Sequence, residues 1–124
     1  MTDIRTLLWL DFATCAAFAL MLAVVAGPLE QMLGLPGPVR VAAIVILVAA
    51  ALLMGFTARH QPLFTVGAWL VVAGNAAWVL ASLGLVLAGG LTLPGTAFVL
   101  VQAAAVTGLT ALEATALRRA LQPA

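Results

Sequence analysis

Residues 69–85 read WLVVAGNAAWVLASLGL. No charged residue interrupts this stretch, and its length and apolar character predict a helix that crosses a lipid bilayer. Near its middle lie an amide, Asn75, and an indole, Trp78, about one helical turn apart. Polar groups are unfavourable in hydrocarbon unless they are paired, so the stretch raises the question of what these two side chains bind.

The whole chain shares the apolar character of this stretch. Of its 124 residues, 65% are hydrophobic and only 7% are charged, whereas a soluble domain carries about 25% charged residues. So few charges cannot cover a surface that faces water. The composition therefore predicts an integral membrane protein that lies in the lipid bilayer.

Four apolar segments are predicted to span the membrane, over roughly 6–27, 39–58, 64–89 and 96–117. Each has at least the ~20 residues that cross ~30 Å of hydrocarbon, and the alternation typical of a β-barrel is absent. Short connections rich in Gly and Pro separate them, and in the first, residues 29–35 are predicted to form one short interfacial turn. Because short connections make consecutive helices antiparallel neighbours, we predict an all-α protein with a single transmembrane domain over residues 1–124, folded as an up-down-up-down four-helix bundle.

The arginines predict the orientation of the bundle. The side that holds both chain ends and the second connection carries four of the five: Arg5, Arg59, Arg118 and Arg119. The other side carries Arg40, which is offset by Glu30. Cytoplasmic loops are enriched in basic residues, so we expect an inner-membrane, multi-pass protein with both termini in the cytoplasm.

Five residues within the predicted helices form a candidate intramembrane polar site: Asp11, Asn75, Trp78, Gln102 and Glu113. Residues seven or eleven apart lie on one face of a helix, as Asn75 and Ser82 do, and as Gln102 and Glu113 do. Polar residues in lipid face the bundle interior, so both stripes are expected to point inward. The positions of the two carboxyl groups relative to the arginines predict a similar depth for both, with Asn75 nearer the midplane.

We expect each carboxyl group to have a charged partner, because a lone ionised carboxylate in this layer would take up a proton. Arg59 is the candidate, since an arginine side chain can reach several ångströms along a helix. A structural clasp of Arg59 with Asp11 and Glu113 is favoured over a proton-handling site. For Asn75 we expect a hydrogen bond between helices that fixes packing, and for Trp78 we expect core packing with its N–H paired.

Several classes of function lack support in the sequence. The net charge is +1 without a basic run, so nucleic-acid binding is not expected. One cysteine, Cys15, and one histidine, His60, do not make a metal site. There is no nucleophile–base set, phosphate loop or metalloprotease motif, so we do not expect an enzyme, and no cofactor is indicated.

Two motifs carry a resemblance. GNAxWVLAS matches residues 74–82, and QAxAVxxxxxLE followed by LRR matches residues 102–113 and 117–119. In these the chain resembles a loose group of small, uncharacterised bacterial four-helix membrane proteins. The resemblance spans most of the chain and implies topology only. The chain is also similar to the small multidrug transporters in having four short helices and a carboxylate in the first, but it departs from them because that residue is a shallower aspartate and because tyrosine is absent.

The sequence therefore favours a small non-enzymatic membrane protein. It would act as an accessory subunit that interacts with other membrane proteins, or it would bind a lipid or another apolar ligand. The alternative is a small proton-coupled transporter that uses Asp11 or Glu113. The lipid bilayer is its expected environment, and a second copy or another membrane protein is its expected kind of partner.

Overall fold

The computed structural model describes residues 3–24 and 26–122, which are almost entirely helical and contain no strand. The chain forms five helices, whose bounds are α1 Ile4–Val24, α2 Ala26–Leu33, α3 Gly37–Arg59, α4 Thr65–Ala88 and α5 Leu93–Leu121. Four of them, all except α2, are long and apolar enough to cross a membrane. The predicted fold class is confirmed.

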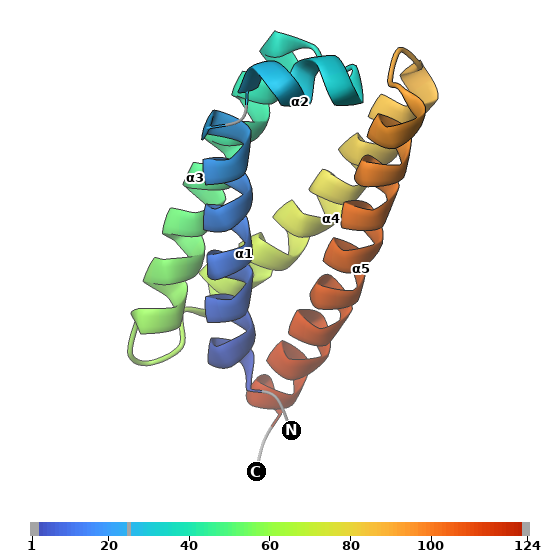
Figure 1. Cartoon of the computed structure of the whole chain (residues 1–124). Helices are drawn as coiled ribbons and strands as arrows, with labels where there is room; N and C mark the ends of the chain where they lie inside the picture. The colour runs from blue at the N-terminus through green and yellow to red at the C-terminus, as the bar shows by residue number, and fades with distance from the viewer. Residues whose placement is uncertain (1–2, 25, 123–124) are drawn as a thin grey trace.

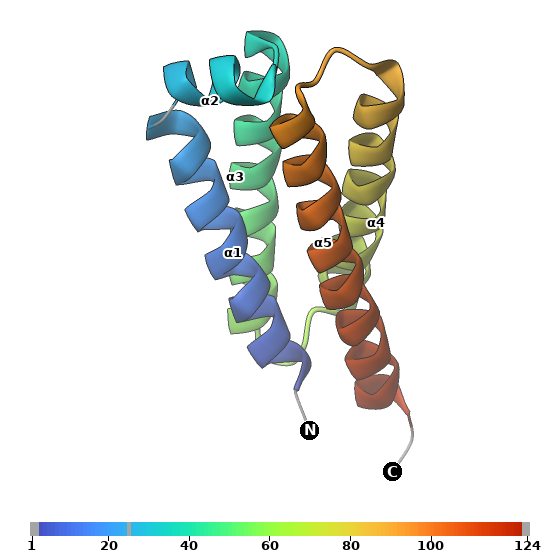
Figure 2. The same ribbon diagram turned by 45° about the vertical axis from the view of Figure 1, so that its right-hand side comes forward.

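The long helices are arranged up-down-up-down (Figure 1). α1 packs along α3 and α4 packs along α5, while contacts between α3 and α4 and between α1 and α5 close the bundle. Figure 2 shows α1 and α5 side by side, with the start of α1 and the end of α5 at the same end of the molecule. The first and last long helices are therefore neighbours.

The helix ends differ from the predicted bounds by a few residues. α5 begins earlier than predicted, because Pro94 is compatible with the first turn of a helix and Thr92 caps it by accepting a hydrogen bond from the Gly95 N–H at 3.0 Å. α5 also continues beyond residue 117 to include Arg118 and Arg119, whose charges suit a helix C-terminus. Residue 25, inside the predicted first segment, and residues 1, 2, 123 and 124 of the predicted domain lie outside the described residues.

The short α2 lies across the end of the bundle opposite the chain ends (Figures 1 and 2). The sequence predicted a single interfacial turn here, whereas the structure has an eight-residue helix. The last residue of α2 is followed by a glycine with positive φ, Gly34 (φ 69°), whose N–H donates to the Glu30 carbonyl at 3.0 Å. Glycine adopts this conformation without steric strain and commonly terminates helices.

Contacts with the start of α5 hold α2 in place. The Thr92 hydroxyl donates to the Met32 carbonyl at 2.7 Å, and the Thr92 N–H donates to the Leu33 carbonyl at 3.2 Å. Gly95 lies so close to α2 that an added Cβ would overlap the Leu33 carbonyl oxygen. The helix is also tied to α3 by the ion pair of Glu30 with Arg40, at 2.9 Å.

The core runs along the axis of the bundle. Its most completely buried side chains come from α1, α3 and α5: Leu8, Leu22, Met54, Leu117, Glu113 and Thr57. Large apolar side chains on the outside of all four long helices are exposed. An apolar exterior, together with a few buried polar side chains in an otherwise apolar core, is the arrangement expected for helices surrounded by lipid.

Candidate functional site

One amide group, that of Asn75, joins three helices in the interior. Its Nδ2 atom donates to Asp11 Oδ2 of α1 at 2.7 Å and to Glu113 Oε1 of α5 at 2.9 Å. Asn75 itself belongs to the middle of α4. The relative exposures of Asn75, Asp11 and Glu113 are 8%, 4% and 0%, so this carboxyl–amide cluster is withdrawn from the surroundings of the protein.

The local sequence explains why these side chains point inward. Along α1, buried residues recur every three or four positions, and Asp11 occupies a position in this stripe between Leu8 and Cys15. The spacing is that of one helical face. The Cys15 thiol lies over the carboxyl group, with Sγ at 3.7 Å from Asp11 Oδ1. A core position of α1 is therefore occupied by an acid.

Hydrogen bonding in the carboxyl–amide cluster is incomplete. An Asn side chain has two N–H donors and here gives one to each carboxyl group. Glu113 Oε2 is buried and has no hydrogen-bond partner. Within residues 3–24 and 26–122, no ion pair involves Asp11 or Glu113. Two acids thus share a neutral donor, without a cation to balance their charge.

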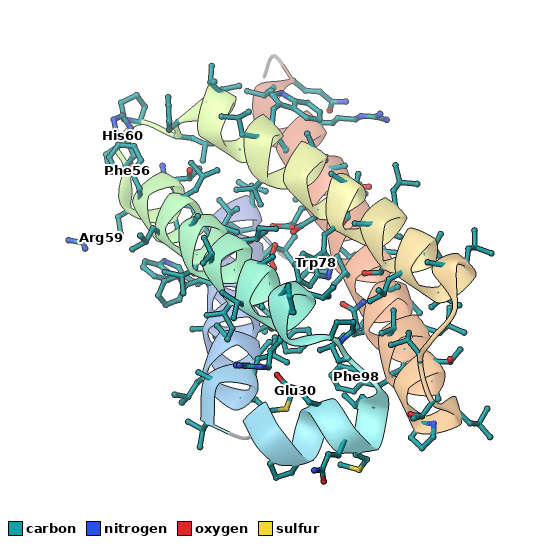
Figure 3. The ribbon with its side chains drawn as sticks, turned by 90° about the horizontal axis from the view of Figure 1, so that it is seen from above. Glu30, Phe56, Arg59, His60, Trp78 and Phe98 are labelled. Carbon is teal, nitrogen blue, oxygen red and sulfur yellow. The ribbon has the colours of Figure 1, made fainter. Side chains whose placement is uncertain are left out.

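Arg59 does not supply the charged partner that the sequence led us to expect. It is the last residue of α3, it is exposed, and Figure 3 shows its side chain pointing away from the bundle. The physical reason is helical register: Thr57 and Ala58 are the residues of this turn that face the core, so Arg59 is turned outward. The predicted clasp of Arg59 with the two acids is wrong, and the amide of Asn75 occupies the position between them.

The depths of Asp11, Asn75 and Glu113 in the bundle also differ from those predicted from the sequence. Counting residues from the helix end placed Asn75 deeper than the two acids, yet the structure places all three in direct contact. α4 crosses the bundle obliquely (Figure 1), so distance along its axis overstates depth in the membrane.

The other two predicted site residues form a second cluster nearer α2. Trp78 Nε1 donates to Gln102 Oε1 at 2.8 Å, and Gln102 Nε2 donates to Ser82 Oγ at 2.9 Å and to the Val99 carbonyl at 3.0 Å. Figure 3 shows Trp78 in the interior of the bundle. Asn75 and Trp78, one turn apart on α4, therefore each donate to a long polar side chain of α5.

A cavity of about 520 Å³ adjoins the carboxyl–amide cluster, and we term it the bundle cavity. Asp11 and Asn75 belong to its wall, which is otherwise largely apolar, and all four long helices contribute to it. Several of its lining side chains are also more than half exposed on the outside of the protein: Leu10, Ile46, Leu70 and Leu112. The bundle cavity therefore reaches the face that would contact lipid.

A second cavity of about 370 Å³ adjoins the Trp78–Gln102–Ser82 cluster. Phe18, Ile46 and Trp78 line both cavities and so lie between them. The Phe18 ring packs edge-to-face against Trp78, with centroids 6.3 Å apart, and against Phe98 at 5.6 Å. Phe18 was not among the predicted site residues, although it lies seven residues after Asp11 and therefore on the same face of α1.

No protein family, curated protein or solved structure matches this chain. The fold and composition define its class, a small all-helical protein whose four long helices are suited to span a membrane. The likeness to small four-helix membrane proteins is one of architecture. Across the described residues, no group of three His, Cys, Asp or Glu side chains is placed to hold a metal ion.

Proposed function

We propose that this protein binds a lipid-like or other apolar ligand in the bundle cavity and has no catalytic chemistry of its own. The observation that supports the proposal best is a cavity of about 520 Å³ inside a small bundle, with an apolar wall interrupted by Asp11 and Asn75. Ligand sites commonly measure about 300–1,000 Å³ and combine an apolar lining with a few polar groups that orient the ligand.

The exposed rim of the bundle cavity gives a route for such a ligand. Because Leu10, Ile46, Leu70 and Leu112 belong both to the lining and to the outer face, a molecule dissolved in the bilayer can enter sideways without crossing water. An apolar body would replace the aliphatic contacts that an empty cavity lacks. A polar head group would meet the amide and carboxyl groups.

A second candidate function is proton-coupled transport, which one observation favours. Asp11 and Glu113 accept from the same nitrogen atom, and neither forms an ion pair with any residue that the structure describes. Carboxyl groups that face the interior of a membrane bundle are typical of proton relays, so this pair is the candidate carrier of the exchanged proton. An accessory role beside another membrane protein is a further proposal. Small residues four positions apart, such as Ala77 with Ala81 and Ala104 with Gly108, support it because they permit close approach of a second helix.

A matched pair of leucine substitutions tests ligand binding. Gly74 lines the bundle cavity and an added Cβ meets nothing within 4 Å, whereas Gly84, on the same helix and equally unobstructed, does not line it. In a variant that keeps Trp78 as its single tryptophan, we expect bromododecanol to quench the Trp78 fluorescence. Gly74→Leu should raise the bromododecanol concentration needed for half-maximal quenching about tenfold. Gly84→Leu should leave this concentration unchanged.

Two outcomes of this titration, and a parallel measurement of proton release, are informative. Equal quenching in both variants would mean that the ligand binds outside the bundle cavity, contrary to the proposal. Absence of quenching in the parent protein would also contradict it. Release of one proton on binding, lost in Glu113→Gln, would favour the transporter over the simple binder.

For orientation, we propose an inner-membrane location with both termini in the cytoplasm. Leu35 and Thr92 lie at the α2 end of the bundle, and Gln61 lies at the end that holds Asp3 and Gln122. Reporters fused after residues 35 and 92 should therefore score as periplasmic, and reporters fused after residues 61 and 124 as cytoplasmic. A cytoplasmic score at 92 would contradict this orientation.

A further inference from the structure

The outer face shared by α1 and α3 carries a groove of about 660 Å³, separate from the two internal cavities. We term it the α1–α3 groove. Its residues are Trp9, Phe12, Leu52, Gly55, Phe56, Arg59 and His60. None of them lines either internal cavity, so the groove is a distinct surface feature that does not depend on the ligand proposed above.

The groove is shaped by a missing side chain and by ordered rings. Gly55 has no side chain, and a Cβ there would lie 3.4 Å from the Phe12 ring. Trp9 and Phe12 pack edge-to-face with centroids 5.4 Å apart. The ring of Phe56 contacts His60 and Phe64, with centroid distances of 5.5 and 5.6 Å. These ring contacts fix the positions of Trp9, Phe12 and Phe56 along the groove wall.

The apolar part of the groove faces lipid. The exposed fractions of Leu52, Phe56 and Trp9 are 68%, 56% and 41%. α3 has 23 residues, which at ~1.5 Å per residue is about as long as the hydrocarbon core is thick. Arg59, its last residue, therefore lies where lipid head groups begin, and the apolar residues lie one to two turns deeper.

The charge of the groove is positive and unbalanced. Arg5 is occupied by the carbonyl oxygens of Ala58 and His60, each at 2.8 Å, and Arg40 by Glu30. Arg59 has neither kind of partner among the described residues, and no acid lines the groove. An exposed guanidinium at this depth presents its planar donors to any phosphate nearby.

We propose that the α1–α3 groove binds an anionic phospholipid. The phosphate contacts Arg59, and an acyl chain lies along Leu52, Phe56 and Trp9. The surface supplies both parts that such a molecule needs, a cation at head-group depth and an apolar channel directly below it.

The test is lipid binding to the purified full-length chain in detergent, measured by native mass spectrometry. Phosphatidylglycerol and phosphatidylcholine with identical acyl chains are compared as probes, with glycerol 3-phosphate as a soluble competitor. We expect phosphatidylglycerol to bind at least fivefold more tightly than phosphatidylcholine. Arg59→Gln should abolish this preference, while Arg118→Gln, which changes an exposed arginine outside the groove, should preserve it. Leu52→Ala should weaken binding of both lipids, because it removes apolar contact area from the groove.

The proposal is overturned if the two lipids bind equally to the parent protein. It is also overturned if Arg118→Gln reduces the preference as much as Arg59→Gln does, because the attraction would then be a general effect of positive charge. Displacement of the lipid by glycerol 3-phosphate would show a free-phosphate site instead. Arg59 and Leu52 are both exposed, so these variants are expected to fold.

Discussion

Replacing Asn75 by leucine is expected to lower the free energy of unfolding by about 2–3 kcal/mol. A neutral outcome would be expected if the amide made only weak contacts between helices, which contribute ~0.6 kcal/mol on average. Here the single donor group serves two carboxyl groups, at 2.7 and 2.9 Å, that are at most 4% exposed. Removing it leaves buried Glu113 without a hydrogen-bond partner and Asp11 with only the Cys15 thiol, which is more unfavourable than the loss of an ordinary hydrogen bond.

Ser82→Ala is the matched control for this variant, because Ser82 lies seven residues further along the same inward stripe. Gln102 keeps its bond to the Val99 carbonyl when the Ser82 hydroxyl is removed, so the loss should be below about 1 kcal/mol. Unfolding would be followed by far-ultraviolet circular dichroism in mixed micelles. Equal destabilisation by the two substitutions would show that the hydrogen bonds of Asn75 to Asp11 and Glu113 contribute no more to stability than an ordinary hydrogen bond does.

A triple variant separates the contribution of the Asn75 hydrogen bonds from that of side-chain packing. When Asp11 and Glu113 are also replaced by leucine, Asn75→Leu should no longer be destabilising, because no buried acceptor remains unpaired. This non-additivity is the signature of groups that act as a unit. Additive effects would mean that the three side chains contribute independently.

Gly95→Ala is expected to destabilise the protein by about 2–3 kcal/mol, although alanine is normally the better helix former. The added Cβ would overlap the Leu33 carbonyl oxygen, a backbone atom that cannot rotate away. To remove this overlap, α2 must move away from the end of the bundle, and this movement breaks the hydrogen bonds of Thr92 to Met32 and Leu33. Backbone amide hydrogen exchange should therefore be faster in α2 of the variant than in α2 of the parent protein, with a smaller change in the other helices.

Gly108→Ala provides the control on the same helix. An added Cβ at Gly108 meets nothing within 4 Å, so helix propensity alone should act and stability should stay equal or rise by up to about 1 kcal/mol. The midpoint temperature of thermal unfolding in detergent, relative to the parent protein, should fall for Gly95→Ala and stay equal or rise for Gly108→Ala. If Gly95→Ala were also neutral, α2 could not be docked as closely as the structure shows.

Hydrophobicity and loop length are local properties, and they were enough to predict most of the fold. The four spans follow from apolar runs that exceed the membrane thickness, and the short connections impose antiparallel neighbours. The sequence is less informative about α2, because residues 26–33 mix Pro, Gly and polar residues. That helix depends on its docking against the start of α5, a contact between segments about sixty residues apart.

For the candidate site, the sequence by itself determined which residues are polar and which helical face each one occupies. The stripe of Asn75 with Ser82 and that of Gln102 with Glu113 follow from helical periodicity alone. Their partners were decided only by the tertiary structure, because pairing depends on the tilt of α4 and on the rotation of each helix about its axis. The charge and length of the Arg59 side chain predicted that it would pair with the two acids. The register of α3 instead turns Arg59 outward, and Asn75 lies between Asp11 and Glu113. Periodicity defines a face within one helix, whereas the choice of neighbour and the cavity between helices arise from how four helices pack together.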